Sequence, residues 1–235
     1  MMAELSSTLS GLPYWGTDIG GFVPTADFTG ELFVRWFQFG AFNPLFRSHG
    51  RTWHLRLPWG WNTGELGFSE VSGYTNGAQD PPASELHNAA VEPICKQYLE
   101  LRYRLMPYLY TAVRECHDTG LPILRAMWLH HADEPAAVAR GDQYLWGRDI
   151  LVAPVVEKGA TSRTLHLPKG TWIDFWTERP ETGGREITLT DSEVSEQDID
   201  QVVSQVSEFG EDNRAGIPRI TGAVIASESG WSRPQ

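Results

Sequence analysis

The spacing of apolar residues along the chain changes near Gly120. Before that point, apolar residues recur at helical intervals over 32–42 and again over 84–119, so two helices are predicted there. Pro93 and Pro107 lie inside the second stretch and are expected to kink or divide that helix, because proline removes a backbone donor.

Two short apolar runs stand on either side of the first predicted helix. Residues 12–19 end at Gly20 and Gly21, and residues 43–49 end at Gly50. Both runs have the length and the glycine stop of a buried strand, so a strand is predicted for each of them.

Beyond Gly120 the pattern becomes one of short β-type runs separated by turn residues, at 122–129, 144–156, 162–168 and 170–177. Short strands at fairly regular spacing are typical of an all-β sandwich. The boundary between two structural regions is therefore predicted near Gly120.

The stretch that follows these runs, residues 190–213, is acidic and polar. Apolar residues recur at helical spacing over 199–209, so a marginal amphipathic helix fits the sequence. A solvated or disordered tail fits the composition equally well.

Composition limits the class of protein and of partner. The 235 residues suffice for one large domain or for parts of two, and 41% hydrophobic with 21% charged residues is typical of a globular chain. A net charge of -11 argues against a nucleic-acid interface, which would carry a basic patch. No apolar run approaches the roughly 20 residues of a membrane span. Partners are therefore expected to include neither nucleic acid nor membrane.

The cysteines and the N-terminal residues give information about the cellular location of the protein. Cys95 and Cys116 have neither a zinc-site nor a disulfide spacing, so both are expected to be reduced and buried. Met1 to Leu5 lacks the basic and apolar parts of a signal peptide. This favours a cytoplasmic location, as long as no longer parent chain precedes Met1.

Five segments, taken in their order and spacing, carry a resemblance to a known family. They are GLPYWGTDIGGF (11–22), WFQFGAFNPLFRSHG (36–50), LRYRLMPYLYT (101–111), PILRAMW (122–128) and DQYLWGRDILVAPVVEKGATSRTLHLPKGTWIDFW (142–176). With these segments the chain resembles the glycoside hydrolases of family 31, which include α-glucosidases and α-xylosidases.

The resemblance implies a fold that is α/β followed by all-β. Residues 1–120 would be the C-terminal part of a (β/α)8 TIM barrel, with strand seven at 12–18, strand eight at 43–49 and the last helices. Residues 121–190 would form the proximal C-terminal β-sandwich, truncated and incomplete. Residues 191–235 would be a divergent acidic tail, since the family's next strand, resembling xxIPLFVRAGxxxP, does not occur in this sequence and no further strand is expected.

The resemblance also implies a chemistry. Family members are retaining α-glycosidases, and retention requires two carboxyl groups about 5–5.5 Å apart, one as nucleophile and one as acid and base. The family carries them in motifs like WxDMNE and WSGD, and neither motif occurs here. No catalytic residue is therefore assigned in this chain, and both carboxyl groups are expected upstream of it.

The intact parent is expected to hydrolyse terminal non-reducing α-linked glucose-type residues in an oligosaccharide or glycoside. An α-xylosidase of the same family, a catalytically inactive sugar-binding module and a non-functional fragment remain as alternatives. The family needs no metal and no organic cofactor. The oligomeric state is open.

Substrate-binding roles are implied at the ends of the two predicted barrel strands. His49 would hydrogen-bond a sugar hydroxyl and Phe22 would wall the same subsite; a structural histidine and a core phenylalanine are the alternatives. Asp18 would orient a neighbouring Arg or His or touch the sugar, with a loop-capping carboxylate as the alternative. Arg47 would pair with a carboxylate of the barrel rim, and Trp15 is either a core residue or a candidate for the pocket.

Two further features stay open. Trp53, Trp59 and Trp61 lie in a long Gly- and Pro-rich loop. They would form a pocket entrance or an aglycone subsite, or else seal the barrel top against the next domain. His130 and His131 look like a metal-binding pair, but adjacent residues on a strand point to opposite faces, so they are interpreted as a loop feature.

Overall fold

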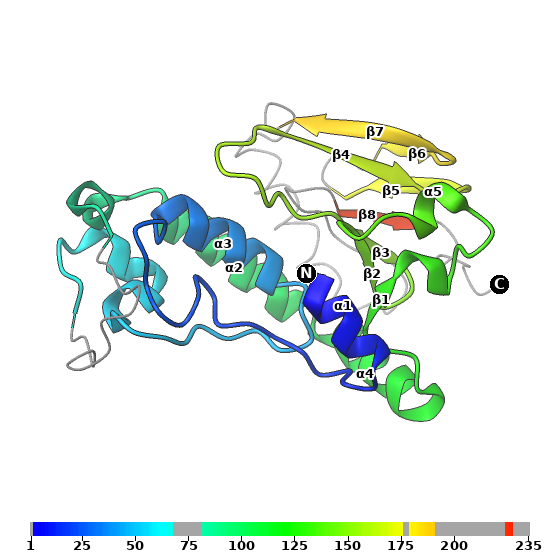
Figure 1. Cartoon of the computed structure of the whole chain (residues 1–235), viewed down its shortest axis with the longest axis horizontal. Helices are drawn as coiled ribbons and strands as arrows, with labels where there is room; N and C mark the ends of the chain where they lie inside the picture. Colours follow the sequence, from blue (N-terminus) through cyan, green and yellow to red (C-terminus); the bar gives the residue numbers. More distant parts are fainter. Residues whose placement is uncertain (1, 68–80, 176–178, 191–223, 228–235) are drawn as a thin grey trace. The chain divides into compact units, whose positions relative to one another are not determined.

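The computed structural model describes residues 2–67, 81–175, 179–190 and 224–227 (Figure 1). The chain divides into two compact units. Residues 14–107 form one unit, called here the helical unit, and residues 1–13 with 108–235 form the other, called here the sheet unit. No helix within the described ranges is long and apolar enough to cross a lipid bilayer.

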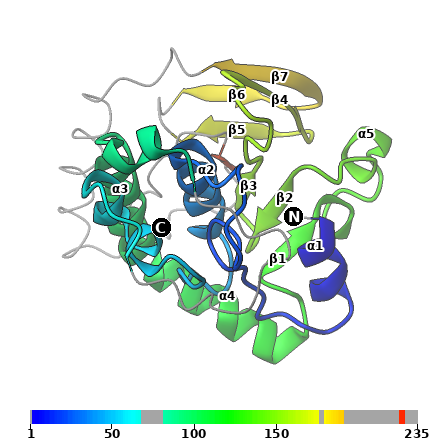
Figure 2. The same cartoon turned by 60° about the vertical axis from the view of Figure 1, so that its left-hand side comes forward.

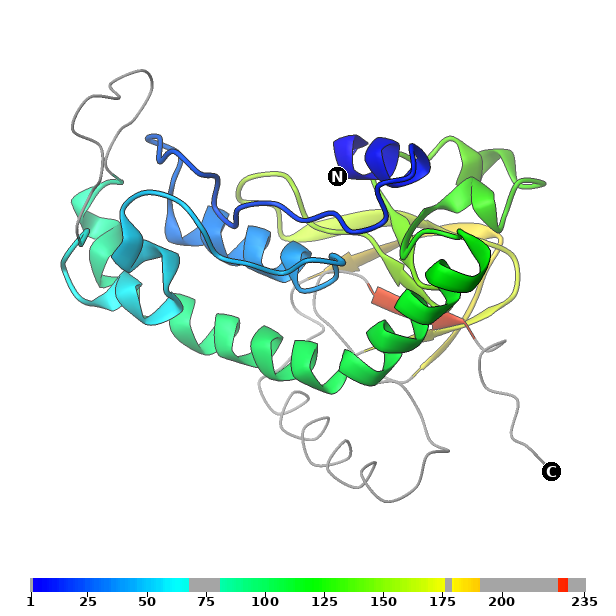
Figure 3. The ribbon, with the colours of Figure 1, turned by 90° about the horizontal axis from the view of Figure 1, so that it is seen from below.

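In the described residues of the helical unit, 14–67 and 81–107, there are two α-helices, three short 3-10 helices and connecting segments. The helices are α2 (Gly30–Gly40), η1 (Trp53–Arg56), η2 (Pro58–Asn62), η3 (Ala83–His87) and α3 (Val91–Arg104). α2 and α3 pack side by side (Figure 3). The core of the unit is aromatic, because the rings of Phe28, Phe33, Phe37 and Trp61 contact one another at centroid separations of 5.2 to 6.5 Å. Such pairs add about 0.5–1.5 kcal/mol each to the free energy of burial.

The first predicted helix is confirmed, two residues earlier than expected. α2 begins where the Thr29 side chain accepts a hydrogen bond from the Leu32 N–H at 3.3 Å, which satisfies one of the donors left free at a helix start. The helix ends at Gly40, well before Pro44. The side chains of Phe33 and Phe37 face the core at helical spacing.

The second predicted helix is divided, as its prolines indicate. α3 ends at Arg104, and α4 (Met106–Thr119) begins after the single residue Leu105, with Pro107 in its first turn. Pro93 does not break α3 because it lies in the first turn, where the backbone N–H has no acceptor within the helix. Gly120 ends α4 with a positive φ of 77° and donates its N–H to the carbonyl of Cys116.

The two strands predicted at 12–19 and 43–49 are not formed as regular strands. The segments run parallel, and an isolated bridge joins Asp18 to Arg47. The prediction of two barrel strands is therefore replaced by two extended segments that meet at a single bridge. Two strands without further strands beside them are only marginally stable, so hydrogen bonding along a longer ladder is not favoured here.

The two segments nevertheless approach each other closely. The Leu45 N–H donates to the Trp15 carbonyl at 2.9 Å. A methyl group at Gly16 would lie 2.5 Å from the Leu45 carbonyl oxygen, so the contact requires glycine at this position. Pro44 has no N–H to donate, which shortens the possible ladder further.

The sheet unit contains two antiparallel sheets. Its strands are β1 (Leu124–Ala126), β2 (Tyr144–Trp146), β3 (Ile150–Val152), β4 (Ser162–Leu167), β5 (Thr171–Asp174), β6 (Pro180–Thr182), β7 (Arg185–Thr190) and β8 (Val224–Ser227). The larger sheet has the order β1-β2-β3-β8-β5-β6, and β4 pairs with β7 in the smaller one (Figure 1). The helices of this unit are α1 (Met2–Leu9), α4, η4 (Met127–Leu129) and α5 (Pro135–Val138), and α1 lies beside β1 (Figure 2).

Side chains from both sheets form one hydrophobic core, which is the arrangement of a β-sandwich. Leu145 and Leu151 come from the larger sheet, and Leu165 and Leu167 come from the smaller one. Trp172 on β5 joins them and is 2% exposed. The strand runs predicted beyond Gly120 are thus confirmed as strands of a two-sheet unit.

One expectation about the C-terminal region is wrong. No strand was expected beyond 190, yet β8 lies in the larger sheet between β3 and β5, antiparallel to both. The physical reason is local, since Val224-Ile225 is a β-branched pair that suits a strand, whereas the strand is only four residues long and lies far along the chain from the regularly spaced strand runs. The possible helix at 199–209 lies outside the described residues.

Candidate functional site

The ends of the two extended segments carry an ion pair. The guanidinium of Arg47 donates from Nη2 and from Nε to the same oxygen of Asp18, at 2.6 and 3.0 Å. The Arg47 side chain is 61% exposed and that of Asp18 is 22% exposed. The pair fixes the direction of the Asp18 carboxylate, although an exposed pair of this kind contributes little to stability.

An aromatic ring and an imidazole lie next to this ion pair in the sequence and face each other. The rings of Phe22 and His49 are 5.3 Å apart at their centroids and inclined by 51°. Phe22 is 44% exposed, and His49 is exposed as well. The Arg51 guanidinium lies 5.7 Å from the centre of the Phe22 ring. This site offers an apolar face together with an imidazole that can form hydrogen bonds.

Trp15 contributes a hydrogen-bond donor. Its indole Nε1 is buried and has no hydrogen-bond partner among the described residues. A buried donor without an acceptor costs free energy, so this N–H is suited to receive an acceptor from a ligand or from another backbone segment. The nearby Trp36 indole differs, because it donates to the Thr17 hydroxyl at 2.7 Å.

Arg56 is a residue that the sequence reasoning missed. Its side chain is buried, with 4% of the residue exposed, and it donates to the backbone carbonyls of Ile19, Phe22 and Arg51. Its guanidinium also stacks on Phe28 at 4.3 Å. Burial lowers the pKa of Arg56 to about 10, partly opposed by the negative charge of Asp18. The sequence signal that could have revealed it is a glycine directly after each segment, Gly20 and Gly50, because a glycine leaves space for a large side chain.

The tryptophans of the long loop divide into two kinds. Trp61 is fully buried, contacts Phe28 and Phe33, and donates its indole N–H to the Leu55 carbonyl at 3.0 Å. Trp53 and Trp59 are 46% and 55% exposed. The loop is therefore anchored through Trp61, and Trp53 and Trp59 remain available to a ligand.

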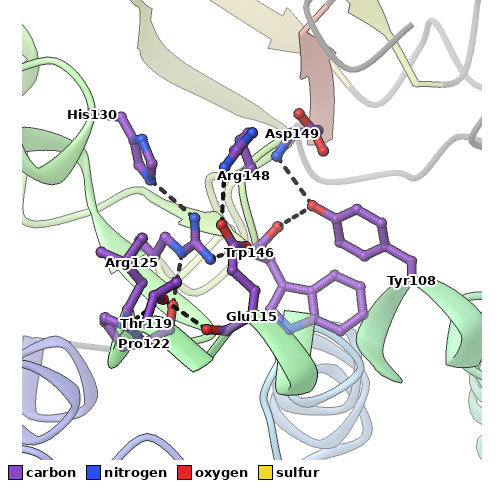
Figure 4. Close-up of polar contacts among 10 residues, drawn as sticks. Tyr108, Glu115, Thr119, Pro122, Arg125, His130, Trp146, Arg148 and Asp149 are labelled. Atoms are coloured by element: carbon purple, nitrogen blue, oxygen red, sulfur yellow. Dashed lines mark hydrogen bonds and ion pairs between the residues drawn. The ribbon is translucent and has the colours of Figure 1, made fainter. Parts of the chain in front are cut away.

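The sheet unit has a polar network of its own (Figure 4). Arg125 is fully buried and donates to Glu115 at 2.6 Å, to the Pro122 carbonyl at 2.7 Å and to the His130 imidazole at 3.1 Å. Arg148 donates to the second oxygen of Glu115 at 3.0 Å. Arg125, Glu115, His130 and Arg148 are each bonded to another group of the protein, so the contacts among them are assigned to holding α4 on the sheet.

The network shifts the pKa values of its members. Burial alone would raise the pKa of Glu115, but hydrogen bonds and positive charges from Arg125 and Arg148 outweigh it and hold that pKa below 4.5. Burial and the neighbouring Arg125 charge lower the pKa of His130 below 6.5. The neutral imidazole of His130 can then accept the bond from Arg125.

His130 and His131 have separate partners. His131 faces Glu134, with 3.7 Å between Nδ1 and the nearer carboxylate oxygen, while His130 faces Arg125. Within the described residues no group of three His, Cys, Asp or Glu side chains is arranged to hold a metal ion. Both histidines lie outside helices and strands, His130 directly after η4, where a loop feature was expected.

Comparison with known proteins defines the class first. Residues 1–112 match the sequence model described as "Glycosyl hydrolases family 31 TIM-barrel domain", and residues 120–207 match "Glycosyl hydrolase family 31 C-terminal domain". The protein is thus of the class built from a TIM-barrel domain followed by a separate C-terminal domain. The chain belongs to glycoside hydrolase family 31, whose members are glycosidases that act on O-glycosyl bonds.

Individual relatives cover several specificities. The chain is 33% identical over 177 residues to an α-glucosidase 2 of Bacillus thermoamyloliquefaciens, covering 75% of this chain and 19% of that protein. It is 31% identical over 187 residues to an α-xylosidase of Saccharolobus solfataricus, covering 78% of this chain and 22% of that protein. The chain therefore spans about a fifth of the length of these relatives.

Solved structures give the same family. A family 31 α-xylosidase from a soil metagenome, complexed with xylose, superposes with a TM-score of 0.68 at 30% identity, over 97% of this chain and 29% of that one. A Flavobacterium johnsoniae family 31 dextranase, complexed with isomaltotriose, superposes with a TM-score of 0.61 at 36% identity, over 79% of this chain and 20% of that one.

Proposed function

We propose that the helical unit supplies part of the sugar-binding wall of a retaining α-glycosidase that removes terminal non-reducing glucose-type residues. The observation that carries this proposal is the pair formed by Phe22 and His49, two exposed rings 5.3 Å apart beside the Asp18–Arg47 ion pair. Neighbouring family structures complexed with xylose and with isomaltotriose support a carbohydrate ligand.

Each side chain has a distinct role in this proposal. The face of Phe22 packs against the apolar C–H groups of a sugar ring, and the His49 imidazole hydrogen-bonds a sugar hydroxyl. Asp18, oriented by Arg47, accepts from a second hydroxyl. The indole N–H of Trp15 is the donor that a further sugar oxygen satisfies.

The hydrolytic step is assigned to groups outside this sequence. A retaining mechanism needs a nucleophilic carboxylate and an acid/base carboxyl about 5–5.5 Å apart. The sequence has neither a WxDMNE-like nor a WSGD-like motif. Asp18 is assigned to binding rather than to nucleophilic attack, because two N–H groups of Arg47 already hold one of its oxygens.

An α-xylosidase specificity is the second candidate. It is favoured by the α-xylosidase structure complexed with xylose, which superposes over 97% of this chain. Glucose and xylose differ by the C6 hydroxymethyl group, so the two specificities differ in whether that group is accommodated. A difference of one such group in a pocket is worth about 1–3 kcal/mol.

Ligand-observed saturation-transfer NMR on the 235-residue chain tests the proposal, with methyl α-glucoside and methyl α-xyloside as ligands. Both are expected to bind, and Phe22→Ala and His49→Gln are each expected to weaken binding about tenfold, as the loss of one good contact implies. Tyr103→Ala, which removes a ring that is 76% exposed on α3, serves as the matched control and should bind like the parent.

Hydrolysis of p-nitrophenyl α-glucoside and α-xyloside is measured on the same samples. No turnover above buffer is expected from the chain alone. Turnover that Asp18→Asn abolishes would instead make Asp18 a catalytic carboxylate. Equal binding by Phe22→Ala and Tyr103→Ala would remove Phe22 from the pocket.

A further inference from the structure

Arg56 joins the two segments that carry the proposed sugar-binding side chains. Its Nη1 donates to the Ile19 carbonyl at 3.0 Å and its Nε donates to the Arg51 carbonyl at 2.8 Å. A longer bond, 3.4 Å, runs from Nη2 to the Phe22 carbonyl. One side chain therefore contacts the backbone three residues before Phe22, at Phe22 itself and two residues after His49.

The backbone around Arg56 is arranged to enclose this guanidinium. The Arg51 N–H donates to the Phe22 carbonyl at 2.9 Å, and the Ser48 hydroxyl donates to the carbonyl of Arg56. The ring of Phe28 closes one side of the guanidinium at 4.3 Å. The enclosure is thus built from both segments and from the aromatic core.

Two glycines leave the space that Arg56 occupies. A methyl group at Gly50 would lie 2.7 Å from Cζ of Arg56, and one at Gly20 would lie 3.2 Å from its Nη1. Both glycines also have positive φ angles, 145° at Gly50 and 80° at Gly20, which other residues rarely adopt. The glycines that follow the two segments are therefore required by the guanidinium as well as by the turns.

We propose that Arg56 is a positioning residue, which sets the distance and inclination of the Phe22 and His49 rings by bonding the backbone of both segments at once. This inference rests on the proposed function of those two side chains in sugar binding. Arginine suits the task because its planar fork presents five donors in fixed directions, whereas a lysine ammonium acts as a single point. The group stays charged near neutral pH, because burial lowers the pKa of Arg56 to about 10 and no further.

A second buried arginine in the same unit provides a matched control. Arg102 donates to the carbonyls of Ala41, Asn43 and Pro44 at 2.6 to 3.0 Å and is 7% exposed. It holds the start of the second segment, away from the residues that bond Arg56. Arg56→Lys and Arg102→Lys thus remove the same kind of group from two places.

The test compares these two variants in the full chain with two readouts. The first is the Cε1–H resonance of His49 in histidine-labelled protein, assigned with His49→Gln, which senses the ring current of Phe22. The second is the Kd for methyl α-xyloside. Arg56→Lys is expected to shift the His49 resonance and weaken binding about tenfold, the size of effect expected for hydrogen bonds from a charged donor. Arg102→Lys is expected to leave the resonance in place and the Kd within about twofold, even if both variants melt earlier.

Three results would overturn the inference, and the first two concern the matched pair of variants. One is an unshifted His49 resonance in Arg56→Lys, and the other is an equal change of both readouts in Arg102→Lys. If the parent chain binds no glycoside, the proposed function fails, and the His49 resonance in Arg56→Lys still decides whether Arg56 positions the rings. Should Arg56→Lys bind the sugar normally while its His49 resonance moves, Arg56 shapes the fold and not the sugar site, which also overturns the inference.

Discussion

The helical unit and the sheet unit provide hydrogen-bond donors to their buried backbone carbonyls in two different ways. In the sheet unit, strand ladders bond the carbonyls, and the buried Arg125 pairs with the carboxylate of Glu115. In the helical unit, the extended segments share one bridge, and the buried Arg56 and Arg102 each bond three carbonyls. A buried guanidinium replaces a ladder where the backbone is irregular.

Each unit contains one free cysteine, and the reactivity of that thiol can be used to measure the unfolding of its unit. Cys95 lies on α3 and is fully buried, and burial raises the pKa of its thiol to about 12. Cys116 lies on α4 in the sheet unit and is 8% exposed. Alkylation requires the thiolate, so labelling of either cysteine in urea measures how far its own unit has opened.

The largest effect is expected from Trp61→Ala. Removal of this ring leaves a cavity against Phe28 and Phe33 and should lower the free energy of unfolding of the helical unit by about 3–5 kcal/mol. Cys95 should label at much lower urea, while Cys116 keeps its parent profile. Trp59→Ala, two residues away and 55% exposed in the parent, is the control and should change neither profile. Equal exposure of both cysteines in Trp61→Ala would show one cooperative unit in place of two.

Arg125→Met removes a fully buried side chain from the sheet unit, as Trp61→Ala does in the helical unit. The change removes the Arg125 donor from the Pro122 carbonyl and leaves the Glu115 carboxylate paired with Arg148, which should cost about 3 kcal/mol of unfolding free energy. Cys116 is then expected to label at lower urea. The control is Arg114→Met on the exposed face of α4, where the pair with Asp118 should contribute nothing measurable. A parent-like profile for Arg125→Met would mean that packing alone holds α4.

Gln143→Met tests a side chain that extends the ladder of the sheet unit. The Gln143 amide donates to the His166 carbonyl at 2.8 Å and accepts from the His166 N–H at 2.9 Å, and both residues are buried. Loss of the two bonds should lower stability by about 2 kcal/mol, measured as a drop in the urea midpoint at Cys116. The control is Thr164→Val on β4, the strand that also carries His166. This change removes an exposed hydrogen bond to Thr188 and should lower stability less than half as much. A larger loss of stability in Thr164→Val than in Gln143→Met would contradict the idea that buried hydrogen bonds contribute more than exposed ones.

The smallest effect is expected from pH. The folded-state pKa of His130 lies below 6.5 because of burial and the Arg125 charge, so the unfolded chain binds the proton more tightly. The stability of the sheet unit is therefore complete above pH 6.5 and falls as pH drops through the folded pKa. A second loss follows below 4.5, where Glu115, whose folded pKa is also lowered, becomes protonated. The urea midpoint at Cys116 should decline between pH 7.5 and 5, and His130→Gln should reduce this first decline without abolishing it, because burial also lowers the pKa of His131 in the same unit.

The sequence predicted those elements whose side chains follow a regular period. α2 repeats phenylalanine at helical spacing, and β2 to β5 are apolar runs between turns, so both were visible without a structure. Pro107 likewise marked the division between α3 and α4. Periodicity reports local geometry, and these elements depend mostly on local geometry.

Features that depend on distant partners were not predictable in this way. The segments at 12–19 and 43–49 have the composition of strands, but strand pairing requires neighbours that composition does not supply. Arg56 bonds Ile19 across 37 positions of sequence, and nothing in its own surroundings distinguishes it from a surface arginine. The pairing of Phe22 with His49 was expected through the family resemblance, whereas its distance and inclination come from the structure.

The hairpin turn between β2 and β3 shows how a helix side chain restricts sequence variation elsewhere. The Tyr108 hydroxyl donates to the Trp146 carbonyl at 2.9 Å and accepts from the Asp149 N–H at 3.1 Å, so it bonds both ends of the turn (Figure 4). Gly147 has a φ of 65°, a conformation that asparagine also tolerates, but any side chain there would overlap the hydroxyl. Asparagine at 147 thus becomes acceptable only after Tyr108 has been replaced by a smaller residue. The two positions, 39 apart in the chain, are expected to change in that order during evolution, Tyr108 before Gly147.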